Sequence, residues 1–144
     1  MAKWNKEIFL KTVKSNCDIR IINIVVELVK FTEKEADQIS WGRGEGYGTM
    51  TFKCKSIDYG HLPIFHITSN GQIKFALNYL KSKIQKKEIC RDFQLKLESN
   101  FMRYFDEDDY PTDIFFTLDE LFVMKTDLDK FMFAVLGMSA RLHQ

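Results

Sequence analysis

Cysteine, proline and glycine are all scarce in this chain of 144 residues, which has three cysteines, two prolines and seven glycines. Cys17, Cys54 and Cys90 lie far apart and form no CxxC or CxxH pair, so their spacing predicts neither a disulfide framework nor a zinc site. The thirteen phenylalanines exclude a disordered chain, because so many large apolar side chains can offset the entropy lost on folding. We expect a folded protein whose thiols are reduced.

Long apolar runs and a strong net charge are also missing. No segment reaches the roughly 20 apolar residues that span a bilayer, and the N-terminal stretch MAKWNKEIFLKTVKS lacks the apolar core of a signal peptide. The formal net charge is +1, so no global field draws the molecule toward nucleic acid or an anionic membrane. These absences predict a cytoplasmic protein without membrane association, folded as a single domain over residues 1–144.

The charges are nevertheless spread unevenly along the chain. Residues 74–91 hold six basic residues and one acidic residue, whereas residues 106–129 hold nine acidic residues and one lysine. Charge runs usually form solvated surface, but these two also allow one face of the molecule to be basic and another acidic.

Apolar residues recur at helical spacing near the N-terminus. Residues 4–15 predict a short amphipathic helix. Asn16 or Asp18 is expected to cap a second helix that runs to about Glu35. The second segment is rich in isoleucine and valine, so a strand remains a competing interpretation.

Between residues 38 and 80 the pattern predicts an antiparallel meander of three or four strands. The stretch TMTFKCK at 49–55 alternates apolar and polar residues, as expected of a strand with one wet face. The segments HLPIFHIT at 61–68 and GQIKFALNYL at 71–80 predict a hairpin, because the Asn70-Gly71 pair between them suits a tight turn with positive φ angles.

Helical spacing returns towards the C-terminus and predicts a helix from about Ile89 to Phe105. Residues 113–116 are short and aromatic enough for an edge strand, and residues 117–120 have the capping-box spacing that opens a short helix. Thr126 or Asp127 is expected to start the last helix. The chain is therefore predicted to be α+β: an antiparallel meander of three to five strands, with N-terminal helices and C-terminal helices packed on one face.

The stretch WGRGEGYG carries glycine at every second position from 42 to 48. A dinucleotide fingerprint needs GxGxxG between a strand and a helix, whereas here a strand follows GxGxGxG, and the GxxxxGK[ST] phosphate loop is absent. The glycines favour a hairpin loop with positive φ angles or close backbone approaches. The alternative is that Arg43 and the bare backbone bind a phosphodiester, while Trp41 or Tyr47 stacks on a base.

Basic residues beside aromatic residues on a sheet can form a platform for single-stranded nucleic acid. Lys53, Lys55 and Lys74, with Tyr47 and Tyr59, fit this pattern, although lysines on a wet sheet face also protect against aggregation. Further candidate contacts, for which counter-ion release would supply most of the affinity, lie in the basic run: Lys81, Lys83, Lys86 and Lys87.

Patterns typical of catalysis or metal binding are lacking. His61 and His66 lie five residues apart on one predicted strand, so they point to opposite faces if the strand is regular. No nucleophile elbow or triad-like pattern occurs, and the acids at 106–113 lack the glycine and final glutamate of a calcium loop. We expect no cofactor, no metal and no enzymatic activity, unless His61 or His66 meets a distant carboxylate in the folded chain.

Four short segments carry a likeness to a known family: ISWGRG at 39–44, GTM at 48–50, PIFHI at 63–67 and SNGQI at 69–73. In this order, followed by a helix and an acidic loop, they resemble a family of uncharacterised α+β domains that often follow the nuclease domain of restriction-endonuclease-like proteins. The resemblance covers about residue 29 to the C-terminus. It implies an association with DNA metabolism or mobile-element defence. It implies no catalytic role, because the chain upstream of Trp41 is too short for a nuclease domain.

Together these patterns predict a non-catalytic binding module that works with DNA or RNA, or with a nucleic-acid-processing partner. The alternative is a protein-interaction or oligomerisation domain. In that case the acidic segment 106–129 and exposed phenylalanines such as Phe115 or Phe116 would meet a protein partner.

Overall fold

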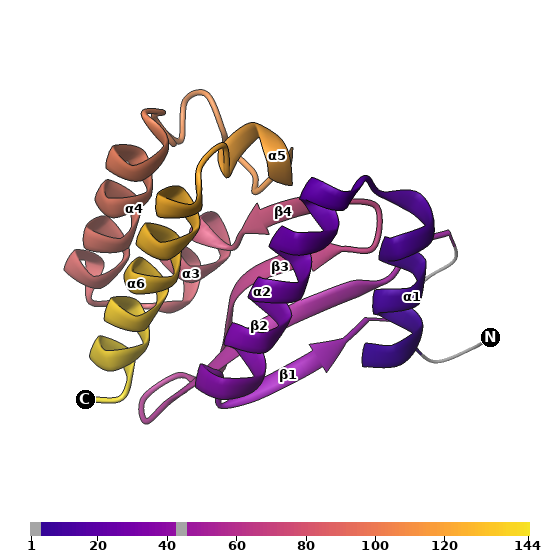
Figure 1. Ribbon diagram of the computed structural model, residues 1–144. Coiled ribbons are helices and arrows are strands. Elements are labelled where there is room, and N and C mark those ends of the chain that lie inside the picture. Colours follow the sequence, from indigo (N-terminus) through magenta and orange to yellow (C-terminus); the bar gives the residue numbers. More distant parts are fainter. Residues whose placement is uncertain (1–3, 43–45) are drawn as a thin grey trace.

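In the computed structural model, which describes residues 4–42 and 46–144, the chain forms one antiparallel sheet with helices on one face (Figure 1). The elements follow in the order α1 (Lys6–Asn16), α2 (Ile19–Glu35), β1 (Gln38–Trp41), β2 (Thr49–Ser56), β3 (Gly60–Thr68), β4 (Gln72–Phe75), α3 (Leu77–Lys83), α4 (Lys87–Phe101), β5 (Phe115–Thr117), α5 (Leu118–Leu121) and α6 (Lys125–Leu142). The strands lie side by side in sequence order, each antiparallel to the next. The α+β prediction is confirmed.

The two N-terminal helices form where polar residues cap apolar segments. The Asn5 side chain accepts a hydrogen bond from the Ile8 N–H at 2.9 Å, and the Asp18 carboxylate accepts one from the Ile21 N–H at 3.0 Å. These bonds satisfy backbone donors that have no partner within the helix. The segment rich in isoleucine and valine is thus the helix α2 and not a strand, and its buried members Ile24, Val25 and Val29 belong to the core. The helix lies across one face of the sheet (Figure 1).

The buried apolar side chains form one contiguous cluster between the sheet and the helices. Phe52 on β2 is completely buried, and its ring centre lies 5.5 Å from that of Phe31 on α2. The ring of Phe65 on β3 continues the cluster, because it lies 5.4 Å from Phe52 and 5.0 Å from Phe131 on α6. The helix α4 packs against the outer side of α6 (Figure 1). One face of the sheet is therefore held by α1, α2 and α6.

Two predicted elements end earlier than the sequence pattern indicates. Strand β4 stops at Phe75, and the rest of the predicted hairpin arm forms α3. The carboxylate of Asp113 accepts hydrogen bonds from the N–H groups of Asn78 and Tyr79 at 2.8 and 3.1 Å, so a distant segment caps this helix. Helix α4 ends at Phe101 and not at residue 105, because Met102 adopts the left-handed conformation with φ of 54°.

The C-terminal elements occur near their predicted positions with small shifts. The predicted edge strand is β5, and the short helix that follows it is α5. Helix α6 begins at Lys125, and Asp127 lies inside its first turn, where its carboxylate accepts a hydrogen bond from the Met124 N–H at 3.0 Å. Over residues 4–42 and 46–144, no helix combines the length and the hydropathy required to cross a membrane.

The glycine-rich stretch connects β1 and β2, and the Gly42 N–H donates to the Thr49 carbonyl at 2.7 Å. A Cβ atom on Gly48 would lie 2.3 Å from the ring of Trp4, so only glycine fits there without a shift of that ring. The described part of the loop thus agrees with the hairpin interpretation. The alternative site at Arg43 falls on residues 43–45, which lie outside the described residues.

Candidate functional site

The face of the sheet opposite the helices carries a row of side chains that crosses all five strands. Backbone register places these residues side by side in strand order: Ser40, Thr51, His66, Lys74 and Phe115. Lys53 and Lys55 continue the same side of β2, because side chains alternate between faces along a strand. We call this surface the open face. Many of its side chains line a shallow hollow of about 610 Å³.

A bulge in β3 brings both strand histidines to the open face. Phe52 pairs with Phe65, but its neighbour Lys53 pairs with Pro63, so Ile64 is an extra residue without a partner on β2. The extra residue reverses the alternation, and His61 and His66 both line the hollow. The expectation that they point to opposite faces is therefore wrong. Proline inside a central strand is typical of a bulge, so Pro63 was the sequence signal for it.

His66 lies at the centre of the open face in a positively charged environment. Its Nδ1 atom is 2.7 Å from the hydroxyl oxygen of Thr51. Burial of the ring, then the charges of Lys74 and Lys53, lower the pKa of His66 to about 4. The imidazole is therefore neutral near pH 7, and the two lysines supply the positive charge around it.

The lysines of the open face are available to a ligand. No carboxylate of the described residues forms an ion pair with Lys53, Lys55 or Lys74. The acid that lines the hollow is Asp113, and its two oxygens already accept the N–H groups at the start of α3. Lys74 lies over the ring of Phe115, 4.8 Å from the ring centre. The open face therefore combines unpaired cations with an aromatic ring.

The aromatic residues that the sequence marked as candidates for base stacking do not line the hollow. Trp41 is on the helix-covered face, with its ring centre 5.4 Å from that of Phe9. The Tyr59 hydroxyl accepts a hydrogen bond from the Gln85 N–H at 3.1 Å, and its ring packs against the core. Tyr47 is exposed in the loop before β2. Tyr79 lines the hollow instead, together with residues that no local pattern had marked, such as Thr51.

The basic run at 81–87 is divided between two surfaces. Lys83 extends toward the open face, because its ammonium lies 5.7 Å from the ring centre of Tyr79. Lys81 lies 3.6 Å from Glu107, and both line a separate hollow of about 550 Å³ beside α3 and α4, together with Lys87. Lys86 is exposed at the start of α4.

Part of the acidic segment and of its phenylalanines is used within the fold. Asp113 caps α3, Asp127 binds the first turn of α6, and Glu120 forms an ion pair with Arg103. Phe116 is buried among other rings, so the prediction that it is exposed is wrong. Phe115 is half-buried next to Lys74. The four consecutive acids at 106–109 are nevertheless exposed, so this turn keeps an acidic surface.

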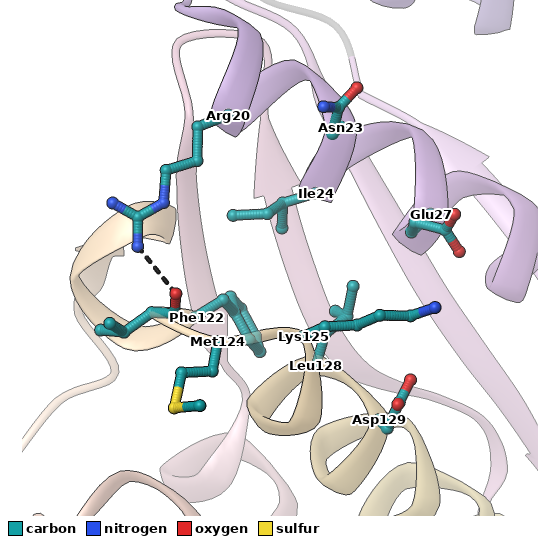
Figure 2. Close-up of a pocket in the computed structure, with 10 residues that line it drawn as sticks. Arg20, Asn23, Ile24, Glu27, Phe122, Met124, Lys125, Leu128 and Asp129 are labelled. Atoms are coloured by element: carbon teal, nitrogen blue, oxygen red, sulfur yellow. Dashed lines mark hydrogen bonds between the residues drawn. The ribbon is translucent and has the colours of Figure 1, made fainter.

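A third hollow, a groove between α2 and the start of α6, has a volume of about 420 Å³ (Figure 2). Arg20 closes one end by donating a hydrogen bond to the Val123 carbonyl at 3.0 Å, as Figure 2 shows. Glu27, Lys125 and Asp129 bring both charge signs to its rim. Because acids and bases alternate there, this groove offers no preference for an anionic ligand.

Potential metal ligands gather away from the open face. Asp37, Cys54 and His143 each offer one ligand atom, and these atoms lie within 4.8 Å of one another. They occupy the covered side of the sheet near the C-terminal end of α6.

Comparison with models of protein families, with curated proteins and with solved structures finds no match for this chain. Functional conclusions therefore rest on the geometry of its own residues.

Proposed function

We propose that this protein is a non-catalytic binding module that holds single-stranded nucleic acid on the open face of its sheet. The observation that carries the proposal is the row of residues across all five strands, with Lys53 and Lys74 on either side of His66 and no paired carboxylate among the described residues. A ligand with regularly spaced negative charges fits such a row better than a single small anion does.

The dimensions of the open face support a strand of a few nucleotides. Neighbouring strands lie about 4.8 Å apart, so the row from Ser40 to Phe115 covers roughly 19 Å. Four-stranded sheets of RNA-binding modules hold two or three bases on an area of similar size. A duplex fits less well, because the face is a shallow hollow without a helix or ribbon that enters a groove.

The side chains offer both kinds of contact that a single strand needs. The ammonium groups of Lys53, Lys55 and Lys74 can bind phosphates, and their neutralisation of phosphates releases counter-ions. Phe115 and Tyr79 provide ring faces on which bases can stack. Lys83, beside Tyr79, extends the cationic surface beyond the sheet.

The proposal agrees with the DNA-related role that the family resemblance implies, and we propose the cytoplasm as the site of action. Arg43, which lies outside the described residues, belongs to the same proposal as a phosphate contact. The proposal includes a partner protein that processes nucleic acid. The nucleic acid bound to that partner would then contact the open face.

A fluorescence-polarisation titration tests the proposal, with labelled single-stranded DNA, single-stranded RNA and duplex DNA at two salt concentrations. We expect single strands to bind more tightly than duplex and all binding to weaken as salt increases. Lys53→Glu/Lys74→Glu should reduce affinity by about tenfold or more, since each reversal replaces a phosphate contact with repulsion. Arg43→Ala tests the loop separately.

The matched control is Lys30→Glu/Lys34→Glu, which makes the same charge change on the exposed side of α2. It should leave the affinity within about twofold of the unchanged protein. Equal losses in both double variants would contradict a specific face, and a lack of binding at low salt would refute the function. Circular dichroism melts of all variants separate lost binding from lost folding.

A further inference from the structure

Three side chains from distant parts of the chain converge behind the sheet. Asp37 lies between α2 and β1, Cys54 lies on β2, and His143 follows the last residue of α6. The Cys54 sulfur is 3.5 Å from Nε2 of His143, and the same nitrogen is 2.6 Å from Oδ2 of Asp37. Sulfur, oxygen and nitrogen atoms thus surround one small volume.

The backbone fixes two of the three groups in place. Cys54 is completely buried on a central strand, where its sulfur lies 3.4 Å from the Ser139 hydroxyl. The Asp37 carboxylate accepts a hydrogen bond from the Lys55 N–H at 2.6 Å, and the Asp37 N–H donates to the Lys53 carbonyl at 3.0 Å. Asp37 is thereby tied to the same strand that carries Cys54. Such outer contacts orient ligands before an ion binds.

A nucleophilic triad does not explain this arrangement. In a triad the imidazole contacts the nucleophile with one ring nitrogen and the carboxylate with the other. Here Cys54 and Asp37 both approach the same nitrogen, Nε2 of His143. The thiol has no exposed surface, and its burial raises the pKa of Cys54 to about 11. Without a cation the sulfur therefore remains a protonated, inaccessible thiol near pH 7.

We propose that Asp37, Cys54 and His143 form a three-ligand binding site for a zinc ion. Tetrahedral zinc bonds, about 2.3 Å to sulfur and about 2.0 Å to nitrogen, separate these two ligand atoms by about 3.5 Å, which is the distance observed. The aspartate and histidine atoms must separate by roughly 0.7 Å to reach tetrahedral positions. Both side chains are partly exposed, so a small rotation is sufficient.

The charges of the three ligands suit a divalent ion that prefers mixed donors. One thiolate, one carboxylate and one neutral imidazole balance the two positive charges of zinc, and binding releases the Cys54 proton to solvent. Sulfur disfavours magnesium and calcium, which prefer oxygen ligands. The exposed side, between Asp37 and His143, leaves a fourth position for water. The bound ion would join the start of β1 to the end of α6.

Cobalt is the first probe, because a cobalt–thiolate bond produces a charge-transfer absorption that reports on the sulfur ligand directly. Tag-free protein is treated with a chelator, dialysed, and titrated with cobalt(II) and then with zinc(II) by calorimetry. We expect one ion per chain, with the absorption, and displacement of cobalt by zinc. Zinc should also raise the melting temperature of the full chain, since the folded state alone assembles the site.

Variants decide which residues hold the ion. Cys54→Ser should abolish the absorption, and His143→Gln should weaken zinc binding by more than the roughly 10–100-fold that loss of an outer contact costs. His143 is exposed, so its variant folds even if the Cys54 variant does not. Cys90→Ser, a buried thiol on α4, is the matched control and should bind as the unchanged protein does. No absorption, or an unchanged one in His143→Gln, would overturn the proposal, whatever the nucleic-acid experiments show.

Discussion

The two faces of strand β2 differ in chemistry although their residues alternate along one backbone. Met50, Phe52 and Cys54 face the helices and have no exposed surface, whereas Lys53 and Lys55 face outward. The inner side chains touch other apolar groups, so their contribution is to stability. Lys53 and Lys55, on the open face, form no ion pair with a described carboxylate, so they add little to the stability of the fold. Residues that do not stabilise a fold are available for binding.

The largest expected effect on stability comes from the side of β2 that the helices cover. Phe52→Ala should lower the free energy of unfolding by about 3–5 kcal/mol, because it removes a fully buried ring between Phe31 and Phe65. Lys53 is the next residue of β2, and its side chain lies on the open face. Lys53→Ala should change the free energy of unfolding by less than about 0.5 kcal/mol. Urea denaturation followed by circular dichroism measures both. Similar losses of unfolding free energy in the two variants would contradict the different roles assigned to the two faces of β2.

The pH dependence of stability probes the open face at a partly buried histidine. Burial of His66 and the charges of Lys74 and Lys53 lower its pKa from 6.5 to about 4, so the unfolded chain takes up the proton first as pH falls. Stability from this residue is complete above pH 6.5 and is lost as pH falls from 6.5 to 4, by up to about 3 kcal/mol. His66→Gln should flatten this part of the pH profile of the urea midpoint. His61→Gln, an exposed variant on the same face, should not.

Gly48 tests the loop that joins β1 to β2. Gly48→Ala should cost about 1–3 kcal/mol, since the new Cβ would lie 2.3 Å from the Trp4 ring and displace it. In a Trp4→Ala background the same change should cost less, and thermal melts of the four proteins give the coupling between the sites. Strict additivity would show that the ring does not determine the need for glycine.

The smallest expected effect concerns a single charge on the open face. Lys53→Met keeps the length and apolar stem of the side chain but removes its ammonium group. The slope of log affinity for single-stranded DNA against log salt should become shallower by roughly one unit, because one phosphate contact is lost. Lys30→Met on α2 should leave the slope unchanged. A slope that stays the same in Lys53→Met would remove this lysine from the interface.

Much of the fold could be predicted from the sequence because its signals are local. Alternation at 49–55, the Asn70-Gly71 pair and the Asp18 cap depend on neighbouring residues, and the structure contains the strand, the turn and the helix that they indicate. Helix α3 could not be predicted in this way, since Asp113 caps it from 34 residues away or more. A tertiary contact there overrides the local preference for a longer strand.

The candidate site was predicted only in part. Lys53, Lys55 and Lys74 lie on one face, as alternation and hairpin pairing indicate. Their expected aromatic neighbour Tyr59 binds the backbone of Gln85 instead, and Trp41, the stacking candidate beside Arg43, covers part of the core. The side to which an aromatic residue turns depends on which helix covers the sheet, and no local pattern contains that information.

The bulge at Ile64 is one surplus residue in an otherwise regular pairing of β2 with β3. Without Ile64, Phe65 and Pro63 would be neighbours, just as their partners Phe52 and Lys53 are, so every other pair of the ladder would be retained. Deletion of this one residue would therefore leave His61 and His66 together on the open face, at the cost of the buried Ile64 side chain. A one-residue insertion elsewhere in the strand would instead exchange its buried and exposed sides.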